Sequence, residues 1–92
     1  MSKLATKVLR QIVERFESME TLARTAFRYC ERVPDRRARL RVMEVATFVA
    51  EQRGCDNSPI FRADLTEALA AMGVRRFRNG GVAYYRGVAR KR

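Results

Sequence analysis

IFRADLTEALAAMGVRRFRNGGVAYYRGVARKR, residues 60–92, is the stretch that decides the predicted fold. Apolar residues in its first part recur with helical spacing, which predicts an amphipathic helix over residues 63–72. Gly73 follows directly and is expected to end this helix, because glycine accepts the left-handed backbone of a helix C-terminus. The residues expected to point inward are Leu65, Leu69 and Met72.

A β-hairpin is predicted after the helix, with strands over residues 74–78 and 82–88. The turn Asn79-Gly80-Gly81 contains Asn-Gly, the strongest short signal for a hairpin, because both residues accept positive φ. Side chains alternate along a strand, so one face of the hairpin packs on the helices and the other is basic. We expect one of Tyr84 and Tyr85 in the core and the other over the sheet; stacking on bases is the alternative.

Helix, basic hairpin and basic tail together are typical of a winged helix, a fold that most often holds DNA. Arginines on such a hairpin can follow the phosphate backbone or enter the minor groove. On the helix, only Arg62 suits the reading of base edges, so sequence specificity is expected to be weak. The predicted nucleic-acid-binding residues are Arg36, Arg37, Arg62, Thr66, Arg75, Arg76, Arg78, Asn79, Arg86, Arg90, Lys91 and Arg92.

Positive charge is concentrated in the same part of the chain. The formal net charge is +10, and residues 58–92 carry eight basic against two acidic side chains, which is net +6. Of the 20 basic residues, 17 are arginine, whose guanidinium binds phosphate in a bidentate manner. The pattern favours binding of double-stranded DNA, with a basic surface kept for solubility as the alternative.

Composition also excludes several classes of protein. The chain has no histidine and two separated cysteines, whereas a zinc site needs about four nitrogen or sulfur ligands. No apolar run is long enough for a membrane span, and the first residues lack the apolar core of a signal peptide. We therefore expect an intracellular protein, cytoplasmic or nuclear, with free thiols. No catalytic spacing or phosphate-cradling glycine loop is present, which predicts neither an enzyme nor a cofactor.

Apolar residues form a heptad seam through residues 1–33, where they recur at alternating steps of four and three from Ala5 to Val33. We expect one long helix that packs partly on its own domain and partly on a second copy, as a dimerisation arm. The alternative is two shorter helices that meet near Glu17-Ser18. The predicted dimer-interface residues are Leu9, Ile12, Phe16, Met19 and Ala23.

Residues 34–92 are predicted to form the second unit, a winged helix with its wing at residues 74–88. Pro34 is expected to end the first helix and Asp35 to cap a helix over residues 36–53, with Gly54 as its C-terminal cap. Arg36 and Arg37 would then oppose the helix macrodipole, which indicates contact with phosphate or with an acidic partner; a solvated basic turn is the alternative. Ser58-Pro59 is predicted to cap the last helix or a single turn before it. The predicted class is mainly α with a small β-hairpin.

A longer pattern covers residues 42–89. It comprises Val45, Phe48 and Val49, then Phe61, Leu65 and Leu69, Met72-Gly73-Val74, and finally Arg76-x-Arg78-Asn79-Gly80-Gly81-x-x-Tyr84-Tyr85-x-Gly87-Val88. This pattern resembles the C-terminal winged-helix domain of the primase-helicases of phages and large DNA viruses. The resemblance implies that the wing arginines touch nucleic acid, and it suggests a role in viral, phage or mobile-element replication, transcription control or packaging. The segment after Gly54 is shorter than in that family, and its ATPase and primase regions have no counterpart here.

Two further functions stay open on the sequence. Winged helices also serve as docking modules, and the acidic residues Asp64 and Glu67 suit a protein partner. A binder of RNA or single strands would use Tyr84 or Tyr85 for stacking.

Overall fold

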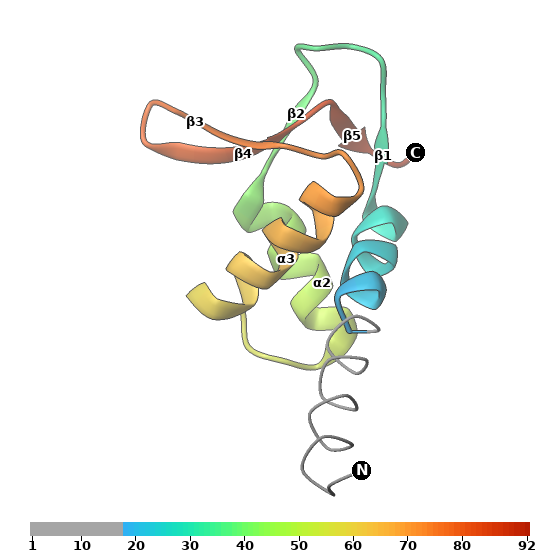
Figure 1. Ribbon diagram of the computed structural model, residues 1–92, viewed down its shortest axis with the longest axis vertical. Helices are drawn as coiled ribbons and strands as arrows, with labels where there is room; N and C mark the ends of the chain where they lie inside the picture. The colour runs from blue at the N-terminus through green and yellow to red at the C-terminus, as the bar shows by residue number, and fades with distance from the viewer. Residues whose placement is uncertain (1–17) are drawn as a thin grey trace, which may run out of the picture.

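Three helices lie on one side of short antiparallel strands (Figure 1). The structure is a computed structural model and describes residues 18–92. A helix over residues 18–29 opens the described chain. The remaining elements follow in the order β1 (Cys30–Arg32), β2 (Arg39–Arg41), α2 (Val42–Arg53), α3 (Pro59–Ala71), β3 (Arg76–Asn79), β4 (Val82–Arg86) and β5 (Val88–Arg90). The fold is thus mixed, three helices with small antiparallel sheets, rather than mainly helical with one hairpin.

The strands form two antiparallel sheets. The larger has the order β2-β4-β3, so β4 lies between the strand before the helices and its own hairpin partner. Leu40 and Arg76 both pair with Tyr85, from the two sides of β4. The smaller sheet joins β1 to β5, with Cys30 opposite Arg90. Residues 74–90 therefore complete two sheets rather than one free hairpin.

The β3–β4 hairpin confirms the turn predicted from Asn79-Gly80-Gly81. Asn79 pairs with Val82, so Gly80 and Gly81 form a two-residue loop. Their φ angles are 60° and 79°, the left-handed backbone that glycine adopts without steric cost. Positive φ at both central residues matches the right-handed twist of the strands.

Both predicted caps beside the helices are present. Gly54 has φ 64° and ends α2 in the left-handed conformation. Ser58 caps α3, because its Oγ accepts a hydrogen bond from the Phe61 amide at 3.1 Å, and Pro59 follows at the first helical position. The helix therefore begins at Pro59 rather than near residue 63.

The predictions for residues 30–41 were wrong in two places. The first helix ends at residue 29 and the chain continues as β1, so Pro34 lies in a loop rather than at a helix end. The second helix begins at Val42, and Arg36 and Arg37 lie in the loop between β1 and β2. Pairing with β4 satisfies the backbone of residues 39–41 and overrides their helical propensity. The macrodipole argument for Arg36 and Arg37 therefore does not apply.

Asp35 caps a turn instead of a helix. Its Oδ1 accepts a hydrogen bond from the Arg37 amide at 2.9 Å, and its carbonyl accepts one from the Ala38 amide at 3.2 Å. A short aspartate side chain stabilises such turns by this local bond. The loop of residues 33–38 is thus ordered by Asp35 before β2 begins.

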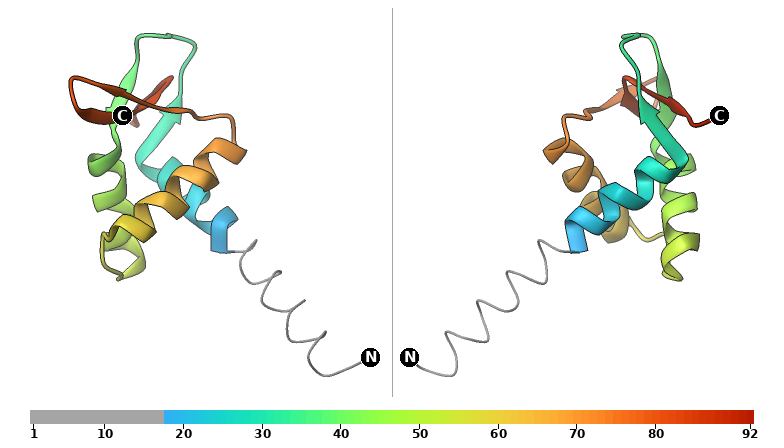
Figure 2. Two further views of the ribbon diagram at one scale, coloured as in Figure 1. Left: turned by 60° about the vertical axis from the view of Figure 1, so that its left-hand side comes forward. Right: turned by 90° about the vertical axis from the view of Figure 1, so that its right-hand side faces the viewer.

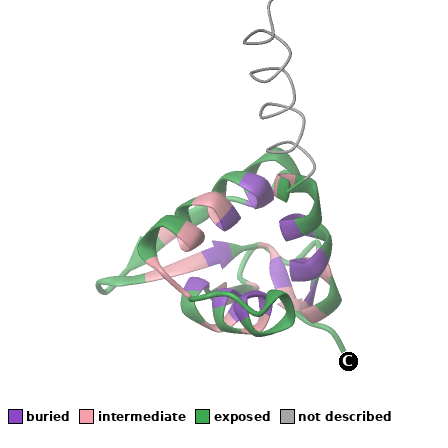
Figure 3. Ribbon diagram, turned by 90° about the horizontal axis from the view of Figure 1, so that it is seen from below, coloured by how far each residue is buried: buried purple, intermediate pink, exposed green. Residues whose placement is uncertain are grey.

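One core joins the helices to the strands. Figure 2 shows the three helices gathered below the strands, and Figure 3 shows that their buried residues face inward. The largest side chains exposed by less than 2% are Tyr85, Leu65, Leu69, Val45, Val49, Val88 and Cys30. The helix over residues 18–29 adds Leu22, Ala23 and Ala26. Within residues 18–92, no helix combines the length and the apolar character that crossing a membrane requires.

Candidate nucleic-acid interface

The three-stranded sheet is strongly basic. Its strands read RLR, RFRN and VAYYR, and they contain no acidic residue. In the described part of the chain, ion pairs join Glu20 to Arg24 and Glu44 to Arg90, so the sheet arginines take part in none. These sheet arginines are Arg39, Arg41, Arg76, Arg78 and Arg86, all exposed. The positive charge of the sheet is therefore left for solvent or a ligand to neutralise.

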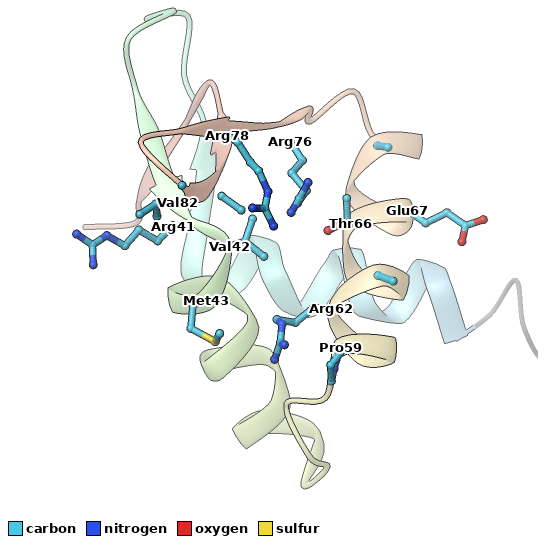
Figure 4. Close-up of a pocket in the computed structure, with 14 residues that line it drawn as sticks. Arg41, Val42, Met43, Pro59, Arg62, Thr66, Glu67, Arg76, Arg78 and Val82 are labelled. Atoms are coloured by element: carbon cyan, nitrogen blue, oxygen red, sulfur yellow. The ribbon is translucent and has the colours of Figure 1, made fainter.

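Side-chain alternation divides these arginines between the two faces of the sheet. Tyr85 is fully buried and marks the face turned toward the helices. Arg76 pairs with Tyr85 and Arg78 with Ala83, so both arginines share that inner face. The hairpin extends past the helices (Figure 1), and the two side chains point into the space between α2 and α3 (Figure 4).

An open groove of about 810 Å³ lies between the hairpin and the helices. Arg76 and Arg78 point from β3 into it, toward Val42 and Thr66 (Figure 4). The groove is lined by Arg41, Val42, Met43, Pro59, Arg62, Ala63, Thr66, Glu67, Ala70, Arg76, Arg78, Gly81, Val82 and Ala83. Arginines from α3 and β3 thus border one open space, whose floor is largely apolar. Arg41 of β2 lines its edge, but the Arg41 side chain points away from Arg76 and Arg78 in Figure 4, because it shares the face of its cross-strand partner Tyr84.

Arg62 is held in place from the α2–α3 loop. Its Nη1 donates to the carbonyl oxygen of Asn57 at 2.7 Å and to Asn57 Oδ1 at 3.0 Å. A guanidinium has five N–H donors, so these two bonds leave donors for an anion in the groove. The loop therefore holds the Arg62 guanidinium at the end of the groove away from Arg76 and Arg78 (Figure 4), with N–H donors left over.

The rest of α3 offers little for reading bases. The Thr66 hydroxyl lies 2.9 Å from the hydroxyl of Tyr85, so this predicted contact residue is engaged within the fold. Glu67 borders the groove but points away from the arginines in Figure 4. Ala63 and Ala70 supply only methyl groups. Arg62 remains the one basic side chain of the helix.

The basic tail does not join the wing. Val88–Arg90 forms β5 beside β1, and the end of the chain lies on the side opposite the hairpin turn (Figure 1). Arg90 is engaged locally: its Nε lies 4.0 Å from Glu44 Oε2, and its guanidinium lies 5.5 Å from the centroid of the Tyr29 ring. The structure thus separates Arg90, Lys91 and Arg92 from the groove, contrary to the single basic surface expected from the sequence.

Three other predicted residues lie near the hairpin but do not line the groove. Arg75 is exposed before β3, and its carbonyl accepts a hydrogen bond from the Arg86 amide at 2.9 Å. Asn79 is exposed beside the turn. Arg86 lies on the face of the sheet turned away from the helices, where its guanidinium is 4.5 Å from the centroid of the Phe77 ring.

Neither tyrosine of β4 is free to stack on a base. Tyr85 is fully buried, and its pKa is raised, chiefly by burial, so its phenol is neutral at neutral pH. Tyr84 stacks on Phe77 with ring centroids 5.5 Å apart, and the Arg39 guanidinium lies 4.3 Å from the centroid of the Tyr84 ring. As expected, one tyrosine is core and the other covers the sheet.

Sequence reasoning missed Arg39 and Arg41, which it assigned to a helix. They flank Leu40 in β2, and Arg41 borders the groove. The alternation of polar and apolar residues in Arg39-Leu40-Arg41 is a pattern that indicates a strand. A three-residue segment is too short for that signal to outweigh helical propensity.

The predicted dimer interface divides into three parts. Leu9, Ile12 and Phe16 lie outside the described residues. Met19 is half-buried and packs against the core of its own chain. Ala23 is only 3% exposed within that core, so it offers no surface to a second copy.

Residues 18–92 offer no site for a metal ion. No group of three or more potential metal-ligating side chains lies together there. Both cysteines are free, Cys30 buried and Cys55 exposed. Comparison of the chain with protein-family models, curated proteins and solved structures found no match.

Proposed function

We propose that this chain is a winged-helix DNA-binding protein that grips the phosphate backbone with little sequence preference. The order β2–α2–α3–β3–β4, with the sheet order β2-β4-β3, supports the winged-helix assignment. Fold alone does not carry the function, which has to be argued from the site. On the resemblance stated above, we place this activity in replication, transcription control or packaging, as binding rather than catalysis.

The observation that carries the proposal is a groove that Arg76 and Arg78 enter and that Arg62 borders (Figure 4). Arg76 and Arg78 enter it from the hairpin, with no carboxylate in ion-pair distance within residues 18–92. Arg62 borders it from α3. A phosphate backbone that runs through the groove would neutralise them and release condensed counterions.

Weak sequence specificity follows from the composition of α3. The groove side of this helix presents Ala63, Thr66 and Ala70, and the Thr66 hydroxyl is already bonded to Tyr85. Discrimination between bases needs donors and acceptors aimed at base edges. Affinity is therefore expected to come from the hairpin and to vary little with sequence.

A salt titration tests the proposal. Binding of a labelled duplex of about two helical turns is followed by fluorescence anisotropy at rising salt. Three phosphate contacts predict a slope of log K against log salt of about −2.7, and Arg76→Ala combined with Arg78→Ala should remove about two thirds of it. The matched control is Arg28→Ala with Arg53→Ala, which removes the same charge from residues outside the groove.

Absence of duplex binding by the unmodified chain at about 50 mM salt would contradict the proposal. An equal loss in the control variant would mean that net charge, and not the groove, binds DNA. A strong preference for single strands that Tyr84→Ala removes would favour the single-strand alternative instead.

The apolar floor of the groove favours one second candidate, docking of an acidic amphipathic segment of a partner protein. Met43 is 53% exposed and Val82 36% exposed beside the groove arginines. Exposed apolar side chains rimmed by charge are typical of a protein-binding surface. An acidic amphipathic peptide that binds while duplex DNA does not would select this function, and Met43→Ser should then weaken the peptide complex.

A further inference from the structure

The face of the three-stranded sheet turned away from the helices carries a second basic surface. We call it the outer face and define it by Arg39, Phe77, Tyr84 and Arg86; Arg41, the cross-strand partner of Tyr84, shares this face at its edge. The two rings stack at 5.5 Å, with Arg39 over Tyr84 at 4.3 Å and Arg86 over Phe77 at 4.5 Å. No described helix covers this side of the sheet (Figure 1).

Arg39 and Arg86 are direct cross-strand partners in the antiparallel pair of β2 and β4. Like charges placed directly opposite each other destabilise a sheet. Within residues 18–92 neither forms an ion pair, and the three strands contain no acidic residue. An anion that bridges the two guanidinium groups would turn this repulsion into attraction.

The aromatic rings restrain the two arginines for such a ligand. Cation–π attraction holds each guanidinium over one ring, and both arginines are exposed, so their N–H donors are accessible to a ligand. Less side-chain freedom is then lost when a phosphate binds. Planar, bidentate recognition of phosphate is the use for which arginine is best suited.

We propose that the outer face binds the phosphate backbone of a second duplex, so that one chain holds two duplex segments on opposite faces of its sheet. The inference rests on the proposed function, because it assigns the first duplex to the groove. Arg76 and Arg78 serve that groove from the inner face, whereas Arg39 and Arg86 serve the outer face. Charge complementarity selects the partner, since a phosphate backbone supplies the negative charge that the sheet lacks.

A two-duplex capture assay tests the inference. Biotinylated duplex on beads is saturated with the protein, and retention of a second, fluorescent duplex is measured. Arg39→Ala with Arg86→Ala should keep binding to the immobilised duplex within about twofold and lose most of the second capture, at least about tenfold. Arg76→Ala with Arg78→Ala should instead lower binding to the beads, and Arg28→Ala with Arg53→Ala should change neither.

Each outcome decides between the two sites. Second capture that survives Arg39→Ala with Arg86→Ala overturns the inference and indicates bridging by a pair of copies. Binding of one duplex without any second capture overturns the inference alone and leaves the proposed function standing. Binding to the beads that depends on Arg39 and Arg86 but not on Arg76 and Arg78 supports the outer face and overturns the groove. No binding at all overturns both, and acidic-peptide binding at the outer face would assign it to a protein partner.

Discussion

The hydroxyl of Tyr85 lies 2.9 Å from Oγ1 of Thr66, which joins the central strand β4 to the helix α3. Tyr85 is fully buried, whereas Thr66 is half-buried at the border of the groove. This bond fixes the hairpin relative to the helix. The bond is thus a polar contact between the strand and the helix at the border of the groove, in addition to the packing of Tyr85 in the core.

Removal of the two partners of this bond should have unequal effects. Thr66→Val leaves the buried Tyr85 hydroxyl without a partner and should lower the free energy of unfolding by about 1–3 kcal/mol. Tyr85→Phe leaves a threonine that water in the groove can reach, so about 1 kcal/mol is expected. Urea denaturation of both variants and of the double variant measures the costs and the coupling between them. Equal costs would indicate that the hydroxyl of Tyr85 reaches water.

The hairpin turn should be sensitive at Gly81 and tolerant at Gly80. No atom lies within 4 Å of a side chain added at either position, so any cost comes from the backbone alone. Gly81→Ala places a β-carbon at φ 79° and should cost about 1–2 kcal/mol. Gly80→Asn should be nearly neutral, because asparagine accepts the left-handed conformation. Thermal denaturation compares the two, and a large loss in Gly80→Asn would contradict the two-residue turn.

Burial raises the pKa of the Cys30 thiol to about 11 from an ordinary value of 9.0. Its Sγ donates to the Ala26 carbonyl at 3.3 Å, and the side chain is 1% exposed. The folded state holds the thiol proton more tightly than the unfolded state does. The stabilisation that results is therefore fully present below pH 9. About 2–3 kcal/mol should be lost as the pH rises from 9 to 11, on a scale of about 1.4 kcal/mol per unit.

Two measurements check this expectation. The decline in unfolding free energy between pH 9 and 11 should be steeper in the unmodified protein than in Cys30→Ala, which lacks the titrating group. Alkylation of the native protein at pH 8 should modify the exposed Cys55 and spare Cys30 until denaturant is added. Rapid alkylation of Cys30 in the native state would contradict the burial of this thiol.

The features that the sequence predicted correctly are those that neighbouring residues specify. Gly80-Gly81 and the cap at Ser58 depend on φ preferences and on a side chain three residues away. Strands β1, β2 and β5 escaped prediction because each has three residues and exists only through a distant partner. Arg39–Arg41 pairs with residues 84–86. A pattern of three residues carries no information about a partner so distant in the sequence.

In the candidate site, too, features that neighbouring residues specify were predicted, and features that depend on distant strand pairing were not. Arg76 and Arg78 were predicted because they adjoin a strong turn signal. The separation of Arg90 from them could not be predicted, because it depends on the pairing of β5 with β1. Arg39 and its stacking on Tyr84 depend likewise on the register of β2 against β4. Residue type thus indicated the ligand class, whereas tertiary pairing determined which arginines act together.

The pairing of β1 with β5 also bears on how the chain folds. Cys30 and Arg90 are partners although almost the whole described chain separates them. Closing so long a loop has an entropic cost that precedes the gain from contact, whereas the β3–β4 hairpin forms between neighbours on a microsecond scale. We therefore expect the hairpin and its arginines to be assembled early on the folding pathway. The β1–β5 sheet, which contains Arg90, should form last, and its amide hydrogens should be the first to exchange with solvent.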